Sequence, residues 1–158
     1  TNPVPDLTWS DLAIFNSEVR LPVLIKGVLD PRDVKLAKEA GCAGVIVSNH
    51  GGRQLDTVLP TATALRPIAE AGGTDFVVIV DGGIQRGTDI VKGLALGANA
   101  VMIGRQLLWA LAIGGEKGAL DALTIFITEF EIALGVIGVN SVSELSPEVI
   151  VSVPSIFR

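Results

Sequence analysis

The only histidine of the chain lies in a short polar segment that could carry out acid–base chemistry. Residues 48–56 read SNHGGRQLD, with His50 three residues before Arg53. Histidine takes up a proton near neutral pH, and the planar guanidinium of arginine can hold a carboxylate through two parallel hydrogen bonds. This pair predicts proton transfer on a small carboxylic acid. The alternative is a hydrogen-bonded structural histidine beside a surface arginine.

Two glycine-containing segments are typical of a site that binds phosphate. Residues 81–87 read DGGIQRG, and a Gly-Arg pair follows at 104–105. Glycines let backbone N–H groups approach an anion closely, and a helix that begins after such a turn adds the positive end of its dipole. The candidate residues are Asp81, Gly82, Gly83, Gln85, Arg86, Gly104 and Arg105. The alternative is that the glycines only form tight turns and the arginines are solvated.

Lys26 ends an apolar run, LPVLI. A charge in that position is costly unless it faces a ligand or an anion, and there it would stabilise developing negative charge. A lysine that escapes to solvent at a strand end is the alternative. Cys42, the only cysteine, is expected to be a small core residue, and the sequence holds no metal-ligand spacing.

These residues follow four short apolar runs that are typical of strands, at 21–26, 44–48, 76–81 and 100–104. Helices are predicted at 8–19, 61–71, 87–96 and 120–136, and another between Asp30-Pro31 and Ala40-Gly41. Runs that are apolar at consecutive positions indicate parallel strands covered on both faces. A doubly wound sheet and a (β/α)8 barrel both fit this βα repeat. Polar residues after all four runs favour the barrel, whose chemistry lies along one rim.

The length of 158 residues predicts a single segment that forms half of such a barrel, because a whole one takes about 250 residues. Two phosphate-type turns on the last two strands indicate the C-terminal half. Half a barrel exposes its inner face and two sheet edges, which invite pairing with another chain. We therefore expect the N-terminal half, covalently joined or separate, or a second copy of the chain as partner, and a homo-oligomer.

Composition excludes several classes of protein. Hydrophobic residues make up 49% and charged residues 18%, which argues against disorder. A net charge of -5 without a basic run argues against nucleic-acid binding. The longest stretch without Asp, Glu, Lys or Arg is 40–52, shorter than the roughly 18 residues of a membrane span. A soluble protein is expected. The chain ends in IFR rather than in a peroxisomal tripeptide, so a peroxisomal address is not supported and the cytoplasm is the default expectation.

The motifs LPVLIKG (21–27), SNHGGRQLD (48–56), DGGIQRGTD (81–89) and IGR (103–105) together resemble the FMN-dependent 2-hydroxy acid oxidase and dehydrogenase family. The resemblance runs from about Leu7 to Leu145 and covers the C-terminal half of the family's barrel, its strands five to eight. It implies an FMN cofactor and a small 2-hydroxy acid substrate.

The resemblance also implies a role for each matching residue. Lys26 would lie by the flavin N1–C2 region and support negative charge on the flavin, and Ser48 would contact FMN. His50 would be the catalytic base, and Arg53 would bind the substrate carboxylate. The ribityl and phosphate site would comprise Asp81, Gly82, Gly83, Gly104 and Arg105.

Two departures from the family pattern stand out. Gln85 occupies a position where many members have a phosphate-binding arginine, so either Arg86 compensates or the phosphate is held more weakly. The chain also contains no tyrosine. In the family, the first four strands supply substrate-binding tyrosines and contacts to the flavin ring.

The function implied is oxidation of a small L-2-hydroxy acid, such as L-lactate or glycolate, to the 2-oxo acid, with O2 reoxidising the flavin to give H2O2. Activity is expected to require the other barrel half. One alternative is a non-catalytic half-barrel that binds FMN or another phosphate. Another is a different phosphate-binding barrel, against which the His50 and Arg53 pair argues.

Overall fold

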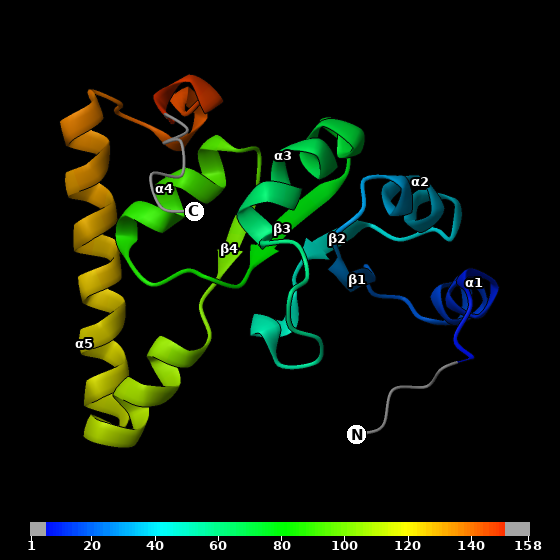
Figure 1. The fold of residues 1–158 in the computed structure, drawn as a ribbon, viewed down its shortest axis with the longest axis horizontal. Coiled ribbons are helices and arrows are strands. Elements are labelled where there is room, and N and C mark those ends of the chain that lie inside the picture. Colours follow the sequence, from blue (N-terminus) through cyan, green and yellow to red (C-terminus); the bar gives the residue numbers. More distant parts are fainter. Residues whose placement is uncertain (1–5, 151–158) are drawn as a thin grey trace.

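The computed structural model describes residues 6–150, which form four strands and five α-helices in alternation (Figure 1). The strands are β1 (Leu24–Val28), β2 (Gly44–Val47), β3 (Val77–Asp81) and β4 (Ala100–Met102). The helices are α1 (Trp9–Glu18), α2 (Arg32–Glu39), α3 (Thr61–Gly72), α4 (Gly87–Ala95) and α5 (Arg105–Ile137). Short 3-10 turns are η1 (His50–Gly52), η2 (Val142–Glu144) and η3 (Pro147–Val149). The tripeptide at 156–158 lies outside the described residues.

The four strands are all parallel and lie in the order β1-β2-β3-β4. Sequential order without a reversal is the arrangement of a barrel segment, whereas a doubly wound sheet reverses its order at a switch point. Among the described strands, β1 and β4 each have one edge without a partner. The order therefore favours the barrel over the doubly wound sheet.

Only one face of the sheet is covered, as expected of half a barrel with an exposed inner face, although the apolar runs taken alone indicate strands covered on both faces. Val45 and Val47 on β2 and Val78 and Val80 on β3 are at most 2% exposed, because α2 and α3 pack over them. Between them, Ile46 and Ile79 point to the opposite face and are only half-buried. In a closed barrel that face is the interior. The sheet face that would line the interior of a closed barrel is therefore uncovered.

The predicted start of the first helix agrees with the structure. Thr8 and Asp11 form a reciprocal capping box at α1, since the Thr8 hydroxyl accepts from the Asp11 N–H and the Asp11 carboxylate accepts from the Thr8 N–H. Cys42 belongs to the buried core, as predicted. Burial also raises the pKa of its thiol, as is typical of an inert core cysteine.

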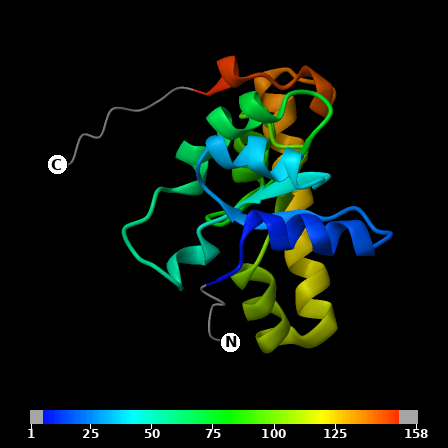
Figure 2. The ribbon, with the colours of Figure 1, turned by 90° about the vertical axis from the view of Figure 1, so that its right-hand side faces the viewer.

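Two elements differ from the sequence prediction. The run 21–26 contains a strand only from Leu24, and β1 continues to Val28, so that Lys26 lies in the middle of the strand rather than at its end. The late helix, predicted at 120–136, begins at Arg105 and is interrupted at Gly115, whose φ is +59°. Figure 2 shows how the chain reverses there, so that the second part of α5 runs antiparallel to the first.

None of the described helices is long and apolar enough to span a membrane.

Candidate active site

A cleft of about 530 Å³ lies at the carboxyl ends of the strands and gathers most of the predicted site residues. It is lined by Lys26, His50, Gly51, Arg53, Gln54, Asp81, Gly82, Gly83, Ile84, Gln85, Met102, Gly104, Arg105, Gln106, Leu108 and Trp109. Ser48 is buried beneath it, at 1% exposure. Arg86 is the one predicted residue that the structure brings neither into the cleft nor beneath it. Parallel strands explain the clustering, because their carboxyl ends meet along one rim.

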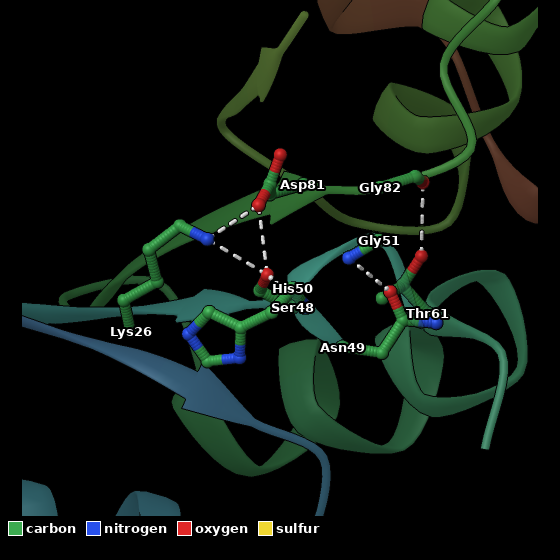
Figure 3. A network of polar contacts seen from close by, with 8 residues as sticks. All are labelled: Lys26, Ser48, Asn49, His50, Gly51, Thr61, Asp81 and Gly82. Atoms are coloured by element: carbon green, nitrogen blue, oxygen red, sulfur yellow. Dashed lines mark hydrogen bonds and ion pairs between the residues drawn. The ribbon is translucent and has the colours of Figure 1, made fainter. Parts of the chain in front are cut away.

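Lys26, Ser48 and Asp81 form a hydrogen-bonded triad that links three neighbouring strands (Figure 3). The Lys26 ammonium donates to the Asp81 carboxylate at 2.5 Å and to the Ser48 hydroxyl at 2.9 Å. The Ser48 hydroxyl donates to the same carboxylate oxygen at 2.7 Å. Lys26 is in register with Ile46, and Asp81 lies two residues after Ile79, so both side chains point to the open face of the sheet. The triad therefore fixes a cation at the floor of the cleft.

The carboxyl group of Asp81 stays ionised in this environment. Burial alone raises its pKa, but hydrogen bonds from Lys26 and Ser48 and the charge of Lys26 together hold the pKa below its usual value. The side chain is 18% exposed, so solvent screens these contacts only in part. An ionised Asp81 therefore holds the Lys26 side chain in place at the floor of the cleft.

We expect the triad to stabilise the fold at neutral pH and to lose that effect in acid. The pKa of Asp81 is lower in the folded than in the unfolded chain, so its contribution is present above the ordinary value of about 3.9 and lost as the pH falls through the lowered value. Asp81→Asn should cost about 1–2 kcal/mol at pH 7. Urea unfolding of both proteins at several pH values measures this, and the difference should shrink below about pH 4.

Asp56→Asn supplies the control for that experiment, because Asp56 is exposed on the loop after η1 and does not line the cleft. Its free energy of unfolding should match that of the wild type across the same pH range. A loss for Asp81→Asn that is as large in acid as at pH 7 would contradict the assigned charge of the triad.

His50 is held in a left-handed backbone conformation at the start of η1. Its φ is +56°, which only a small minority of residues other than glycine adopt. The Ser48 hydroxyl accepts from the His50 N–H at 3.0 Å, and the Asn49 side chain accepts from the Gly51 N–H at 3.0 Å. The strain is thus fixed by neighbouring bonds, which is common at functional sites. Sequence reasoning did not identify Asn49, although an Asn before a Gly-Gly turn is typical of such a cap.

The imidazole of His50 packs directly against the backbone of Gly27 on the neighbouring strand. A Cβ added to Gly27 would lie 2.9 Å from the imidazole Cε1. Gly27 also has a φ of +104° and lies at the register shift between Lys26 and Val28. Glycine is thus required twice, for the backbone conformation and for the close approach of the ring.

We expect Gly27→Ala to displace the His50 imidazole. NMR can follow this without ambiguity, because His50 is the only histidine. The wild type should show a strong nuclear Overhauser effect between the Gly27 Hα and His50 Hε1 protons, and the variant should shift the His50 ring signals. Stability should fall by about 1 kcal/mol through the positive φ alone.

Gly73→Ala is the matched control for this prediction. Gly73 also has a positive φ, +69°, but a Cβ there would meet nothing within 4 Å. It should show a similar stability loss with unchanged His50 signals. Identical ring signals in the wild type and Gly27→Ala would contradict the contact.

The start of α4 differs from the anion site that its sequence predicted. The N–H groups of Gln85 and Arg86 both donate to the Asp89 carboxylate at 3.1 Å, and the N–H of Gly87 donates to Glu129 at 2.8 Å. The Arg86 guanidinium pairs with Glu129 at 3.2 Å. Two carboxylates of the chain therefore occupy the place that an external anion would take.

The cleft nevertheless fits a flavin that carries a phosphate. A Cβ added to Gly83 or to Gly104 would meet nothing within 4 Å, so both glycines leave free space beside the backbone in the cleft that Arg105 also lines. Met102, Leu108 and Trp109 add apolar lining, which sequence analysis did not identify. A volume of about 530 Å³ lies in the usual range for ligand sites, about 300–1,000 Å³.

Comparison with curated proteins finds relatives over most of the chain. A 2-hydroxyacid oxidase from Dictyostelium discoideum is 44% identical over 92% of this chain and 38% of its own length. An L-lactate dehydrogenase from Pseudomonas syringae pv. syringae is 44% identical over 93% of this chain and 39% of its own. Rat 2-hydroxyacid oxidase 2 is 42% identical over 94% of this chain and 42% of its own. The chain thus spans less than half the length of these relatives.

Solved structures of mandelate oxidase resemble the chain closely. One with a monooxide FMN adduct matches at a TM-score of 0.83 and 42% identity, over 87% of this chain and 44% of that one. Another, with 3,3-difluoro-2-hydroxy-3-phenylpropionic acid, matches at 0.85 and 40% identity, over 89% and 43%. The predicted half of an α/β barrel is confirmed.

The family model described as FMN-dependent dehydrogenase matches residues 2–152, almost the whole chain. This match agrees with the cleft, which is lined by Gly83, Gly104, Arg105 and His50. The chain therefore belongs to the FMN-dependent dehydrogenase family, whose cofactor is FMN.

Proposed function

We propose that this chain forms the half of an FMN-dependent oxidase that carries the base, the carboxylate-binding arginine and the phosphate site. The substrate would be a small L-2-hydroxy acid, with L-lactate and glycolate as the first choices. One observation carries the proposal. His50 begins the short turn η1, Arg53 directly follows it, and both line the cleft that Lys26 also lines. A site that only binds phosphate would need neither His50 nor Arg53.

The reaction removes two electrons and two protons from the substrate carbinol and leaves a 2-oxo acid. Arg53 would hold the substrate carboxylate, which places the carbinol carbon within reach of His50. His50 would take up one proton at its imidazole. Lys26, Ser48, Gly83, Gly104 and Arg105 would hold FMN, which would supply the acceptor for the two electrons and for the second proton. O2 would be the final acceptor of both electrons and both protons, which gives H2O2. Lys26, fixed by Ser48 and Asp81, would stabilise the negative charge that develops beside it.

The proposal includes the half of the barrel that this chain does not contain. Each outer strand, β1 and β4, has an unpaired edge within the part of the chain that the structure describes, and the inner sheet face is open. Unpaired edges of this kind pair readily with further strands. Further sequence of the same protein or a separate chain would supply four more strands, or a second copy of the chain would close the barrel, in a homo-oligomer. The opposite wall of the substrate pocket would come from that partner.

Anaerobic mixing with substrate tests the proposed function. L-lactate or glycolate should bleach the visible absorbance of the bound flavin, and O2 should restore it with formation of one H2O2 per turnover. The 158-residue chain alone should bleach slowly, because one wall of its pocket is open. A protein that binds FMN but is not reduced by any 2-hydroxy acid, including mandelate, would be a non-catalytic binding module instead.

A further inference from the structure

The starts of α4 and α5 meet the same end of the cleft but offer very different surroundings to an anion. The amides that open α4 are bonded to Asp89 and Glu129. α5 begins at Arg105, its N-cap residue Gly104 forms no side-chain cap, and its first turn holds no acidic residue. α5 therefore presents a positive helix end without a carboxylate in its first turn, whereas α4 presents two carboxylates.

The two arginines beside these helix starts differ in the same way. Arg86 donates to Glu129 and does not line the cleft. Arg105 lines the cleft and makes no ion pair among the described residues, and its one hydrogen bond is a long one, 3.5 Å, to the carbonyl of Gly51. Gln85 lines the cleft at the same end but carries no charge.

Glu129 holds the Arg86 side chain outside the cleft. Its carboxylate accepts from both the Gly87 N–H and the Arg86 guanidinium, and these two bonds, the first above all, lower its pKa. Gly87 itself has no room for a side chain, because a Cβ there would collide with the α5 backbone at Phe130. The close packing of α4 on α5 thus keeps Glu129 at the start of α4.

We infer that Arg105 alone carries the charge by which this chain selects a phosphorylated flavin, and that Arg86 is a structural residue. This inference rests on the proposed flavin function and deepens it. A phosphate near pH 7 carries about -1.5 to -2 charges. With a single guanidinium at that end, the preference for FMN over riboflavin should amount to one charge-assisted contact, about 10- to 150-fold in affinity.

Three single variants test the inference, each titrated with FMN and with riboflavin while the flavin fluorescence is followed. The experiment uses the full-length protein, from which the flavin has been removed. Arg105→Gln should weaken FMN binding about 10- to 150-fold and leave riboflavin binding within about twofold, so that the preference disappears. Gln85→Arg should tighten FMN binding about tenfold and leave riboflavin unchanged, because it adds a second cation at the phosphate end.

Arg86→Gln is the matched control, since Arg86 directly follows Gln85 after the same glycine turn. It should leave the affinities for both flavins unchanged. Its side chain is 69% exposed, so the variant is expected to fold, and an unfolding midpoint confirms this. A selective loss of FMN affinity in Arg86→Gln would overturn the inference.

An equal loss of both flavins in Arg105→Gln would also overturn it. The proposed function fails in a different pattern, in which the wild type binds neither FMN nor riboflavin, and that result overturns the inference as well. Selective binding of FMN that survives in Arg105→Gln would leave the function standing and reject only the role of Arg105.

Discussion

Replacing His50 by glutamine is expected to slow substrate-driven reduction of the flavin by about 10²- to 10⁴-fold, the usual contribution of a positioned general base. Glutamine retains polar atoms at that place but cannot take up the proton. FMN affinity should change little, because the phosphate end of the cleft, at Gly83, Gly104 and Arg105, is left intact. Anaerobic stopped-flow absorbance with a saturating 2-hydroxy acid measures the rate.

The pH profile separates a catalytic from a structural role for His50. If the wild-type kcat/KM has a limb that falls in acid, that limb should be absent from the slow residual reaction of His50→Gln. Asp56→Asn, on the same loop but outside the cleft, should reduce its flavin at the wild-type rate. A His50→Gln protein that binds FMN normally and still reduces it at the wild-type rate would refute the assignment.

The grouping of the site residues could be predicted from the sequence because it follows from topology. Each apolar run ends next to polar residues, and parallel strands in sequential order bring those ends to one rim. Lys26, Ser48 and Asp81 were predicted on three separate runs, and the structure joins them in one hydrogen-bonded triad. The direct bond between Lys26 and Asp81 spans 55 residues of sequence.

The place of Lys26 within β1 could not be predicted from its apolar run. The run suggests a strand that ends at Lys26, but β1 continues through Gly27 to Val28 with a register shift between Lys26 and Val28. A glycine with positive φ inside a strand is typical of a bulge. That irregularity leaves a bare backbone against which the His50 ring packs.

The choice between Gln85 and Arg86 as the residue that faces the cleft was also beyond the sequence. Both follow the same glycine turn, and the local pattern gives them equal access to a phosphate. The choice depends on Glu129, which is 43 residues from Arg86 in the sequence and reaches it only because α5 packs on α4. The sequence predicts the helix at 120–136 that carries Glu129, but its pattern does not show that this helix packs on α4.

Replacing Arg53 by lysine is expected to raise KM for a 2-hydroxy acid by about 10- to 150-fold, with a smaller effect on kcat. Lysine keeps the positive charge but loses the planar fork that binds a carboxylate through two parallel bonds, and one charge-assisted hydrogen bond accounts for about 1.5–3 kcal/mol. Arg53 lines the cleft three residues beyond His50, so both are expected to contact the same bound molecule. Steady-state H2O2 production with L-lactate or glycolate gives both constants.

The amide of the same substrate decides whether Arg53 recognises the carboxylate itself. The wild type should oxidise lactamide far less efficiently than L-lactate, because an amide cannot accept both bonds of the guanidinium as an anion does. Arg53→Lys should then lower kcat/KM for L-lactate and leave that for lactamide nearly unchanged, which narrows the discrimination between them. If the substitution lowers kcat/KM for both compounds by the same factor, Arg53 supports the His50 turn instead of binding the carboxylate, and another cleft cation, Arg105 or Lys26, must hold it.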